Sequence, residues 1–366
     1  MTTVNLVIFG IGNVGSTLVE QVESARSVIE KQQGIRIRIP VIANSKQALF
    51  HFEDQDQLPW DHRFKRNAVA YTLQDICAFV RREQLEHLIA VDATASKDLV
   101  RDYQLLIESG FHLVAANKIA NTLDFEFYQN LRKHLENNQK KFFYETNVGA
   151  GLPVVDTVKG LHDSGEMVTK IKGVFSGSLS YVFNRFSSEN IPFSEVLTDA
   201  VEQGFTEPDA REDLSGSDVA RKLLILAREI GLKTELKDVE VESLVPSNLN
   251  GSTSLAEFKS RVHELDEPFE AIKTGQAQDR VLRYIGELDA VHNKVKVALL
   301  SEPAHSDFAQ LKGTDALFEI YTESYGSRPL IIKGAGAGKD VTARGVCTDI
   351  LKIAKLIKTK HIEYQH

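Results

Sequence analysis

The chain has 366 residues, more than one compact hydrophobic core usually holds, so we expect two domains. Hydrophobic residues make up 42% of the chain and charged residues 26%, which excludes a disordered or fibrous protein. The formal net charge is −8, the wrong sign for a protein that binds nucleic-acid phosphates.

Cysteine content and apolar patterning indicate where the protein works. The two cysteines, Cys77 and Cys347, are far fewer than a secreted disulfide scaffold carries. No uncharged apolar run approaches the roughly 20 residues of a membrane span, and no basic segment precedes the apolar run 4–9 as in a signal peptide. We therefore expect a cytoplasmic enzyme that acts on a small molecule, with no membrane or nucleic-acid partner.

The first part of the chain alternates between strand-like and helix-like patterns, which predicts a doubly wound α/β sheet. Helical spacing begins at Ser16 and recurs over 99–108, where Ser96 or Asp98 is the predicted N-cap. Short apolar runs predict strands at 4–9, 34–43, 88–93, 113–116 and 142–144.

Beyond Gly149 helical patterns come first and β-like runs follow, as in an α+β domain. Helices are predicted at 154–161, 180–186, 194–203, 215–230 and 340–357. Strands are predicted at 169–175, 281–288, 294–300, 317–322 and 330–333, with a hairpin around 291–293.

Gly10, Gly12 and Gly15 match the dinucleotide-binding fingerprint in its required setting, after a strand and at the start of a helix. Gly10 permits the tight turn, Gly12 lets the backbone approach a pyrophosphate, and Gly15 lets helix and strand pack closely. The helix N-terminus offers unpaired N–H groups to the phosphates. The setting favours a dinucleotide cofactor over the alternative, a plain glycine-rich turn.

The end of the second predicted strand bears on the choice of cofactor. An NAD site carries an acid there for the ribose 2′-hydroxyl, but this chain has Asn44, Ser45 and Lys46. Without an acid to repel the 2′-phosphate, we expect NADP, with NAD as the alternative. Lys46 is either a phosphate contact or a solvated loop residue.

Asp218 and Lys222 stand four residues apart and share one face of the helix predicted over 215–230. The helix is apolar on nearly every side and Ile225 lies on the same face, so we expect a partly buried pair rather than an exposed ion pair. A lysine held by a carboxylate at such a place is a candidate proton donor.

An acidic turn precedes that helix, with Glu207, Asp209, Glu212 and Asp213 within seven residues. Charge runs of this kind are usually solvated loops or extended helix caps. The alternative is a site for a substrate ammonium group.

These motifs together resemble homoserine dehydrogenase over nearly the whole chain, most of all the dehydrogenase half of the bifunctional aspartate kinase–homoserine dehydrogenases. Because Met1 lies only nine residues before Gly10, we expect no kinase domain, and no regulatory domain after residue 366. The resemblance is carried by segments 10–15, 116–118, 145–153, 173–181, 204–222 and 334–345.

The resemblance implies a Rossmann NAD(P)-binding domain at 1–148, an α+β catalytic and dimerisation domain at 149–333, and a segment at 334–366 that returns to the nucleotide domain. It implies the reduction of L-aspartate 4-semialdehyde to L-homoserine, a precursor of threonine and methionine, by a homodimer or higher homo-oligomer. Rival readings are another small-aldehyde or amino-acid dehydrogenase on this fold, or a non-catalytic nucleotide-sensing protein. A sensor would need neither Lys222 nor Glu207, so these residues favour the enzyme.

Site residues follow from the same resemblance. Lys222 would be the proton donor and Asp218 its orienting partner. Glu207 would bind the substrate amino group with Asp213 nearby, and Lys118 would lie by the nicotinamide and the substrate. The cofactor would also be lined by Gly10, Ile11, Gly12, Asn13, Val14, Gly15, Thr94 and Gly338.

A monovalent cation, such as sodium or potassium, is implied at Glu145, Val148, Ala150 and Leu152, held largely by backbone carbonyls. Hard oxygen ligands suit such an ion. The eleven histidines and two cysteines show no zinc-ligand spacing, so a catalytic transition metal is not expected.

Two positions depart from the family pattern. Ile119 stands where many relatives have a second lysine, and Phe205 where many have tyrosine. Each change removes a polar group near the site, which leaves cofactor preference and substrate hydrogen bonding open.

Overall fold

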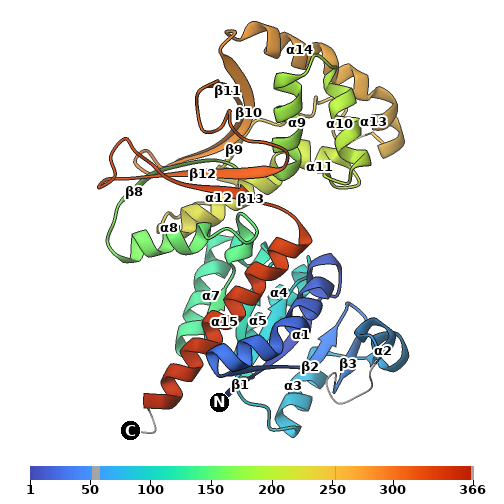
Figure 1. Cartoon of the computed structure of the whole chain (residues 1–366), viewed down its shortest axis with the longest axis vertical. Coiled ribbons are helices and arrows are strands. Elements are labelled where there is room, and N and C mark those ends of the chain that lie inside the picture. The colour runs from blue at the N-terminus through green and yellow to red at the C-terminus, as the bar shows by residue number, and fades with distance from the viewer. Residues whose placement is uncertain (52–57, 252, 364–366) are drawn as a thin grey trace. The chain divides into compact units, whose positions relative to one another are not determined.

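The computed structural model describes residues 1–51, 58–251 and 253–363, and the chain divides into two compact units (Figure 1). Unit 1 contains Met1–Asn147 and Gly338–His366, and unit 2 contains Val148–Ala337. Within the described part of the chain, no helix combines the length and the apolar content that crossing a membrane requires.

Unit 1 is built on a seven-stranded sheet with the order β4-β3-β2-β1-β5-β6-β7. Its strands are β1 (Thr2–Phe9), β2 (Ile35–Ala43), β3 (Gln47–Phe50), β4 (Val69–Ala70), β5 (Leu88–Asp92), β6 (His112–Ala115) and β7 (Phe142–Phe143). The five strands from β2 to β7 in this order pair in parallel, and β3 and β4 add antiparallel pairs at one edge. The α/β prediction is confirmed, and the order reverses between β1 and β5, where doubly wound sheets bind ligands.

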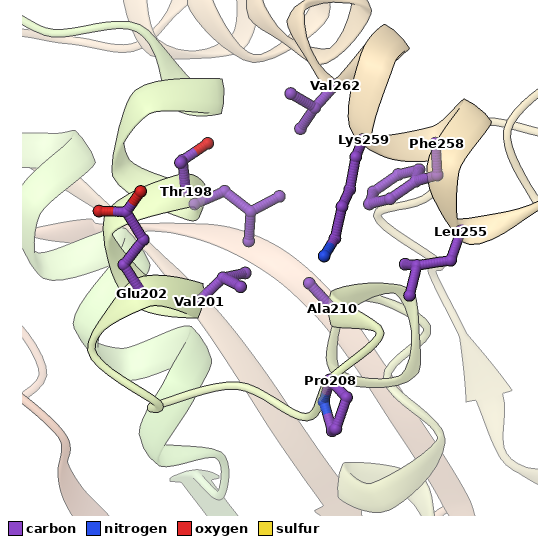
Figure 2. Close-up of a pocket in the computed structure, with 10 residues that line it drawn as sticks. Thr198, Val201, Glu202, Pro208, Ala210, Leu255, Phe258, Lys259 and Val262 are labelled. Carbon is purple, nitrogen blue, oxygen red and sulfur yellow. The ribbon is translucent and has the colours of Figure 1, made fainter.

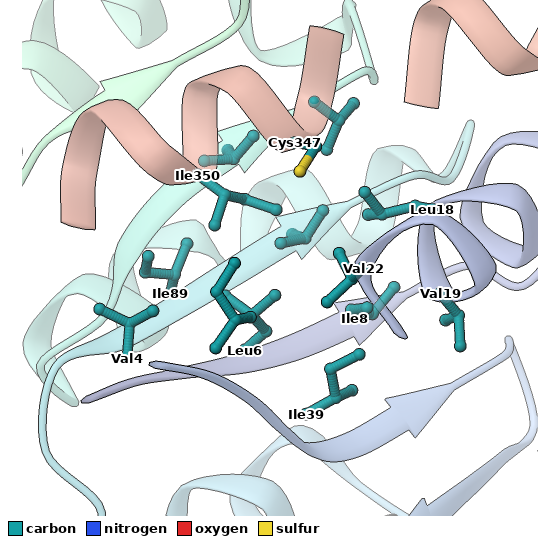
Figure 3. Packing of buried hydrophobic residues seen from close by; sticks show 14 of the residues in the cluster. Val4, Leu6, Ile8, Leu18, Val19, Val22, Ile39, Ile89, Cys347 and Ile350 are labelled. Atoms are coloured by element: carbon teal, nitrogen blue, oxygen red, sulfur yellow. The ribbon is translucent and has the colours of Figure 1, made fainter. Parts of the chain in front are cut away.

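The helices of unit 1 cover both faces of this sheet. They are α1 (Asn13–Gln33), α2 (Trp60–Asn67), α3 (Leu73–Arg82), α4 (Lys97–Arg101), α5 (Tyr103–Glu108), α6 (Ile119–Thr122), α7 (Phe125–Asn137), the 3-10 turn η1 (Glu145–Asn147) and α15 (Lys339–Glu363). Alternate side chains of β1 point to opposite faces. Val4, Leu6 and Ile8 pack with α1 and α15 (Figure 3), and Val7 and Phe9 pack with α3, α5 and α7. The last helix of the chain is therefore part of the core of unit 1.

Two helix predictions in unit 1 were wrong. The helix predicted from Ser16 begins at Asn13, because Gly12 already serves as its N-cap. The single helix predicted over 99–108 is two short helices, α4 and α5, which meet at Asp102. The N-cap of α4 is Ser96, whose hydroxyl accepts a hydrogen bond from the Leu99 amide at 3.1 Å.

Unit 2 has a six-stranded sheet with the order β13-β12-β8-β10-β11-β9. Its strands are β8 (Val168–Val174), β9 (Glu240–Val241), β10 (Arg280–Asp289), β11 (Lys294–Pro303), β12 (Asp315–Thr322) and β13 (Leu330–Ala335). All neighbours are antiparallel except β9 and β11, and β10 with β11 forms the predicted hairpin. The helices are α8 (Val154–Asp163), α9 (Gly177–Ser188), α10 (Phe193–Glu202), α11 (Ala210–Leu214), α12 (Ser217–Glu229), α13 (Leu255–Arg261) and α14 (Asp266–Gly275), with 3-10 turns η2 (Leu236–Asp238) and η3 (Val262–Leu265).

Two glycines of this sheet make room for the end of β8. Gly173 pairs with Gly286 across β8 and β10. A Cβ atom on either residue would lie within 3.0 Å of the Phe175 ring, and one on Gly286 would also meet Leu223 of α12 at 2.8 Å. The missing side chains let α12 and Phe175 lie close against the sheet.

Candidate active site

In unit 1 the glycine turn between β1 and α1 combines close packing with one open position. Gly10 has φ +91°, and a Cβ there would lie 2.6 Å from the Ala93 carbonyl oxygen. A Cβ on Gly15 would overlap the Gly10 carbonyl oxygen, whereas the space around Gly12 is open to 4 Å. The backbone of Gly12, at the N-terminus of α1, is thus accessible to a phosphate. Asn13 and Val14 form the first turn of α1, and Ile11 precedes it.

A pocket of about 530 Å³ adjoins this turn at the carboxyl ends of β1, β2 and β5. Its size is that of a small-molecule site. The lining residues are Phe9, Gly10, Asn44, Ser45, Tyr71, Leu73, Thr94, Ala95, Ser96, Asp98, Leu99 and Asp102. The open turn and this pocket fit a dinucleotide. Sequence reasoning missed Tyr71, Asp98 and Asp102 here; Asp98 was considered only as a helix cap.

The end of β2 is closed by Asn44. Its Oδ1 accepts hydrogen bonds from the amides of Lys46 and Gln47, both at 2.8 Å, and the Tyr71 hydroxyl donates to its carbonyl at 2.9 Å. Asn44 and Ser45 line the pocket, while Lys46 is exposed. The end of β2 therefore presents neutral groups to the pocket.

The ends of β5 and β6 carry Thr94 and Lys118. Asp92, the last residue of β5, is 3% exposed and accepts hydrogen bonds from the Thr94 amide and hydroxyl, from Tyr103 and from Asn117. Burial raises the pKa of Asp92, and these hydrogen bonds oppose the rise. Lys118 is the N-cap of α6 and its carbonyl accepts from the Thr122 hydroxyl at 3.1 Å.

In unit 2 the predicted pair on α12 is formed. The Lys222 ammonium lies 2.8 Å from Asp218 Oδ2 and donates to the Phe175 carbonyl oxygen at 2.7 Å. The side chain of Lys222 is 12% exposed and that of Asp218 is 45% exposed. The lysine is thus mostly buried, with its charged end fixed between two oxygens.

Asp213 joins the acidic turn to the start of α9. Its Oδ2 accepts the Glu207 amide at 2.9 Å and its Oδ1 accepts the Ser178 hydroxyl at 2.6 Å. Burial raises the pKa of Asp213, the two hydrogen bonds lower it, and the Asp218 charge adds to the rise. Glu207 is exposed. The four predicted residues Glu207, Asp213, Asp218 and Lys222 therefore belong to one neighbourhood.

Asp209, another acid of the same turn, has a structural role. This residue is the N-cap of α11, where it accepts from the Arg211 amide at 3.1 Å and pairs with the Arg211 guanidinium at 2.6 Å. The hydrogen bonds from Arg211 lower the pKa of Asp209. The helix-cap alternative thus describes Asp209.

The two departures from the family pattern have defined surroundings. Ile119 packs against the apolar cluster of unit 1 that contains Val7 and Phe9. Phe205 is 40% exposed and its ring lies 4.7 Å from the Tyr181 ring, whose hydroxyl accepts from Gln203 at 2.7 Å. Tyr181 thus places a phenol beside Phe205.

The residues predicted to hold a cation lie on both sides of the unit boundary, Glu145 before it and Val148, Ala150 and Leu152 after it. Gly149 and Ala150 have φ of +77° and +53°, a bend that redirects successive carbonyls. In the chain as described, no group of three or more His, Cys, Asp or Glu side chains is placed to hold a metal ion. Gly338, predicted to line the cofactor, lies in unit 1 directly before α15, with φ +118°.

Figure 2 shows a second pocket, of about 280 Å³, between α10, α11 and α13 of unit 2. It is lined by Leu197, Thr198, Val201, Glu202, Pro208, Ala210, Leu255, Phe258, Lys259 and Val262. None of these described lining residues is a predicted site residue, although Pro208 directly follows Glu207.

Two family models match the chain. The model described as homoserine dehydrogenase matches residues 153–351, and that described as homoserine dehydrogenase, NAD binding domain, matches residues 10–145. Among curated proteins, the chain is 37% identical over 350 residues to a bifunctional aspartokinase/homoserine dehydrogenase of Haemophilus influenzae, covering 95% of this chain and 42% of that protein. It is 36% identical to bifunctional aspartokinase/homoserine dehydrogenase 2 of Escherichia coli, covering 97% of this chain and 44% of that one. The chain thus spans about two fifths of the length of these relatives.

Solved structures share the fold. A protein of unknown function from Candida auris is 34% identical with a TM-score of 0.87, over 97% of this chain and 99% of that one. A putative homoserine dehydrogenase from Archaeoglobus fulgidus is 25% identical with a TM-score of 0.74, over 96% and 99%. A hyperthermophilic archaeal homoserine dehydrogenase in complex with NADPH has a TM-score of 0.72 at 22% identity, over 97% and 98%, and supports the fold alone.

Proposed function

The chain belongs to the homoserine dehydrogenase family, and we propose that it interconverts L-aspartate 4-semialdehyde and L-homoserine on the route to threonine and methionine. The observation that carries the proposal is Lys222, held by the Asp218 carboxylate and the Phe175 carbonyl within the segment that matches the homoserine dehydrogenase model. A fixed ammonium in a mostly buried place is suited to give a proton to an aldehyde oxygen and to stabilise the charge that develops there.

The chemistry divides between cofactor and protein. A bound nicotinamide cofactor supplies the hydride for the aldehyde carbon and accepts it in the reverse direction. As hydride reaches the carbon, Lys222 gives a proton to the carbonyl oxygen, and in reverse the lysine amine takes that proton from the alcohol. Asp218 orients the ammonium throughout.

Substrate recognition is proposed for the acidic turn. The Glu207 carboxylate pairs with the substrate ammonium group, which would be costly to desolvate without a counter-charge. The Asp213 carboxylate accepts a hydrogen bond from the backbone amide of Glu207. This contact fixes the backbone position from which the Glu207 side chain extends.

The cofactor is proposed to be NADP, with NAD as the alternative. The open backbone at Gly12 receives the pyrophosphate, and the neutral end of β2 at Asn44 and Ser45 tolerates a 2′-phosphate. For Thr94 and Lys118 we propose contacts with the nicotinamide end of the cofactor, and for Lys118 also with the substrate.

A sodium or potassium ion is proposed at Glu145, Val148, Ala150 and Leu152. The positive φ angles of Gly149 and Ala150 support this proposal, because they turn the backbone sharply between Val148 and Leu152. Carbonyl oxygens are suitable ligands for a hard cation.

We also propose a cytoplasmic homodimer or higher homo-oligomer. β13 is an edge strand of the unit 2 sheet and its Ile331 side chain is 44% exposed. An edge strand with an exposed apolar residue suits pairing with a second copy of the chain, and light scattering measures the resulting mass.

An assay of NADP⁺ reduction tests the proposed activity against its rivals. L-homoserine is compared with 4-hydroxybutanoate, which has the same reacting alcohol but lacks the ammonium group. We expect strong preference for L-homoserine. Equal rates would indicate a general small-alcohol dehydrogenase, and cofactor binding without turnover would indicate a nucleotide sensor.

A further inference from the structure

We propose that Asp92 is a positioning residue that ties the Thr94 turn to the Lys118 turn, so that two walls of the cofactor site keep one arrangement. The inference rests on the proposed function, because it assumes that this end of the sheet receives a nicotinamide cofactor. Asp92 is assigned no contact with cofactor or substrate; it acts through the residues that it holds.

The first tie runs within the loop that follows β5. Asp92 Oδ1 accepts the Thr94 amide at 2.8 Å and the Thr94 hydroxyl at 2.7 Å. Thr94 and Ser96 both line the 530 Å³ pocket. One carboxylate oxygen therefore fixes the backbone and the side chain of a pocket residue.

The second tie runs to the turn after β6, which is the parallel neighbour of β5. Asp92 Oδ2 accepts Asn117 Nδ2 at 3.0 Å, and the same amide nitrogen donates to the Ser96 carbonyl at 3.1 Å. Asn117 Oδ1 in turn accepts the Ile119 amide at 3.0 Å. Asn117 is 4% exposed and directly precedes Lys118. It therefore links the Asp92 carboxylate to the turn that carries Lys118.

This arrangement requires a carboxylate, since donors reach both of its oxygens. An asparagine at position 92 has one acceptor oxygen and one donor NH₂ group. Its NH₂ group would face another donor, either the Thr94 amide or the Asn117 NH₂ group. Asn117 cannot turn its amide over to relieve this, because its Oδ1 is needed by the Ile119 amide. Substitution at Asp92 should therefore release one of the two turns.

Tyr103 provides the matched control. Its hydroxyl donates to the same Asp92 Oδ2 at 2.7 Å, it is 1% exposed, and it does not line the pocket. Tyr103→Phe removes one hydrogen bond from the carboxylate but leaves both ties in place. A merely structural role for Asp92 predicts that Asp92→Asn and Tyr103→Phe behave alike.

Two readouts on the 366-residue chain test the proposal. In hydrogen–deuterium exchange without cofactor, we expect Asp92→Asn to speed exchange at the Thr94 or the Ile119 amide, and Tyr103→Phe to leave both unchanged. In NADPH titrations, we expect Asp92→Asn to weaken binding by about tenfold or more, because a turn released from Asp92 no longer holds a cofactor contact in place. Tyr103→Phe should stay within about twofold even where its loss of Tm matches that of Asp92→Asn.

The double variant Asp92→Asn/Asn117→Asp reverses the polarity of the second tie: the new amide donates to the new carboxylate, which still accepts the Ile119 amide but sets its other oxygen against the Ser96 carbonyl. It should recover part of the lost NADPH affinity, and it also serves if Asp92→Asn alone does not fold. Equal effects of Asp92→Asn and Tyr103→Phe on exchange and affinity would overturn the proposal. A wild type that binds NADPH but does not oxidise L-homoserine refutes the proposed function and leaves this inference standing. If the wild type binds no nicotinamide cofactor, the exchange data alone decide whether Asp92 ties the two turns.

Discussion

At the scale of single residues, the position of the Lys222 ammonium group in unit 2 is fixed by its polar contacts. Lys222 is placed by Asp218 and by the Phe175 carbonyl, and that carbonyl is placed by the packing of Phe175 against two glycines of the sheet. The apolar pattern of α12 predicted the burial of Lys222. The contact with Phe175 could not be predicted, because it joins residues 47 positions apart in the sequence.

Charge on Glu207 should govern substrate affinity. We expect Glu207→Gln to raise KM for L-homoserine by about tenfold, with a much smaller change in KM for NADP⁺, because the lost charge-assisted contact faces the ammonium group. Glu212→Gln, at an exposed acid of the same turn, is the matched control and should change neither constant. Equal increases in both KM values for Glu207→Gln would show that the residue supports the fold instead.

The end of β2 should determine cofactor preference. We expect the unaltered protein to use NADP(H) at least as well as NAD(H), and Asn44→Asp to shift kcat/KM toward NAD(H) by about tenfold, through repulsion of the 2′-phosphate. An aspartate still has an oxygen to accept the Lys46 and Gln47 amides, so the turn is retained. Strong preference of the unaltered protein for NAD(H) would refute this expectation.

Asp213 makes stability depend on pH. Its pKa in the folded chain is raised above 3.8, chiefly by burial, so the folded state holds this proton to higher pH than the unfolded state does. The stability that Asp213 contributes relative to Asp213→Asn should therefore fall as pH rises from about 4 through the raised pKa, and level off above it. Denaturant titrations of both proteins at several pH values measure the difference. A difference that grows with pH would show that the hydrogen bonds to Asp213 outweigh its burial.

At the scale of elements, both ends of the chain build the core of unit 1. α1 and α15 cover one face of its sheet, and Ile350 of α15 is fully buried there beside residues of β1 (Figure 3). The C-terminal helix was predicted at 340–357 and is confirmed as α15. Its packing partners in α1 and β1 are more than 300 residues away in sequence, and no local pattern encodes them.

We expect Ile350→Ala to lower the free energy of unfolding of unit 1 by about 2–5 kcal/mol, the cost of a cavity in a well-packed core. Trp60, the single tryptophan, packs against the same cluster and reports the transition by fluorescence. Lys355→Ala, at an exposed position of α15, should change stability by less than about 0.5 kcal/mol. If both variants unfold like the wild type, α15 does not stabilise unit 1.

Most elements with regular apolar spacing or a continuous apolar run were predicted from the sequence. β4 has two residues, both exposed, and offers no pattern to read. α3 is different: Ile76, Phe79 and Val80 are buried at helical spacing, and Thr72 and Asp75 form a capping box before them. That helix carries a readable signal in the sequence, although it was not among the predicted elements.

For the whole molecule, the division into units shows what the sequence could and could not establish. The change of pattern near Gly149 predicted a boundary, and the units divide between Asn147 and Val148. The nucleotide and catalytic roles assigned to ranges 1–148, 149–333 and 334–366 came from family resemblance and stay predictions. Spacing alone predicted the glycine turn and the Asp218–Lys222 pair, whereas Thr94, Lys118 and the cation residues depended on the resemblance.

Proton transfer by Lys222 is the step on which the proposed homoserine chemistry depends. The rate of L-homoserine-dependent NADP⁺ reduction measures it in the direction in which the lysine amine takes the proton from the alcohol. We expect turnover in the wild type and a loss of roughly 10²–10⁴-fold in Lys222→Ala, the usual effect of removing a general acid or base, with NADP⁺ affinity nearly unchanged. Arg221→Ala, at the exposed neighbouring position, should keep wild-type turnover. A wild type without L-homoserine-dependent reduction, or near-normal turnover in Lys222→Ala, would contradict the role proposed for Lys222.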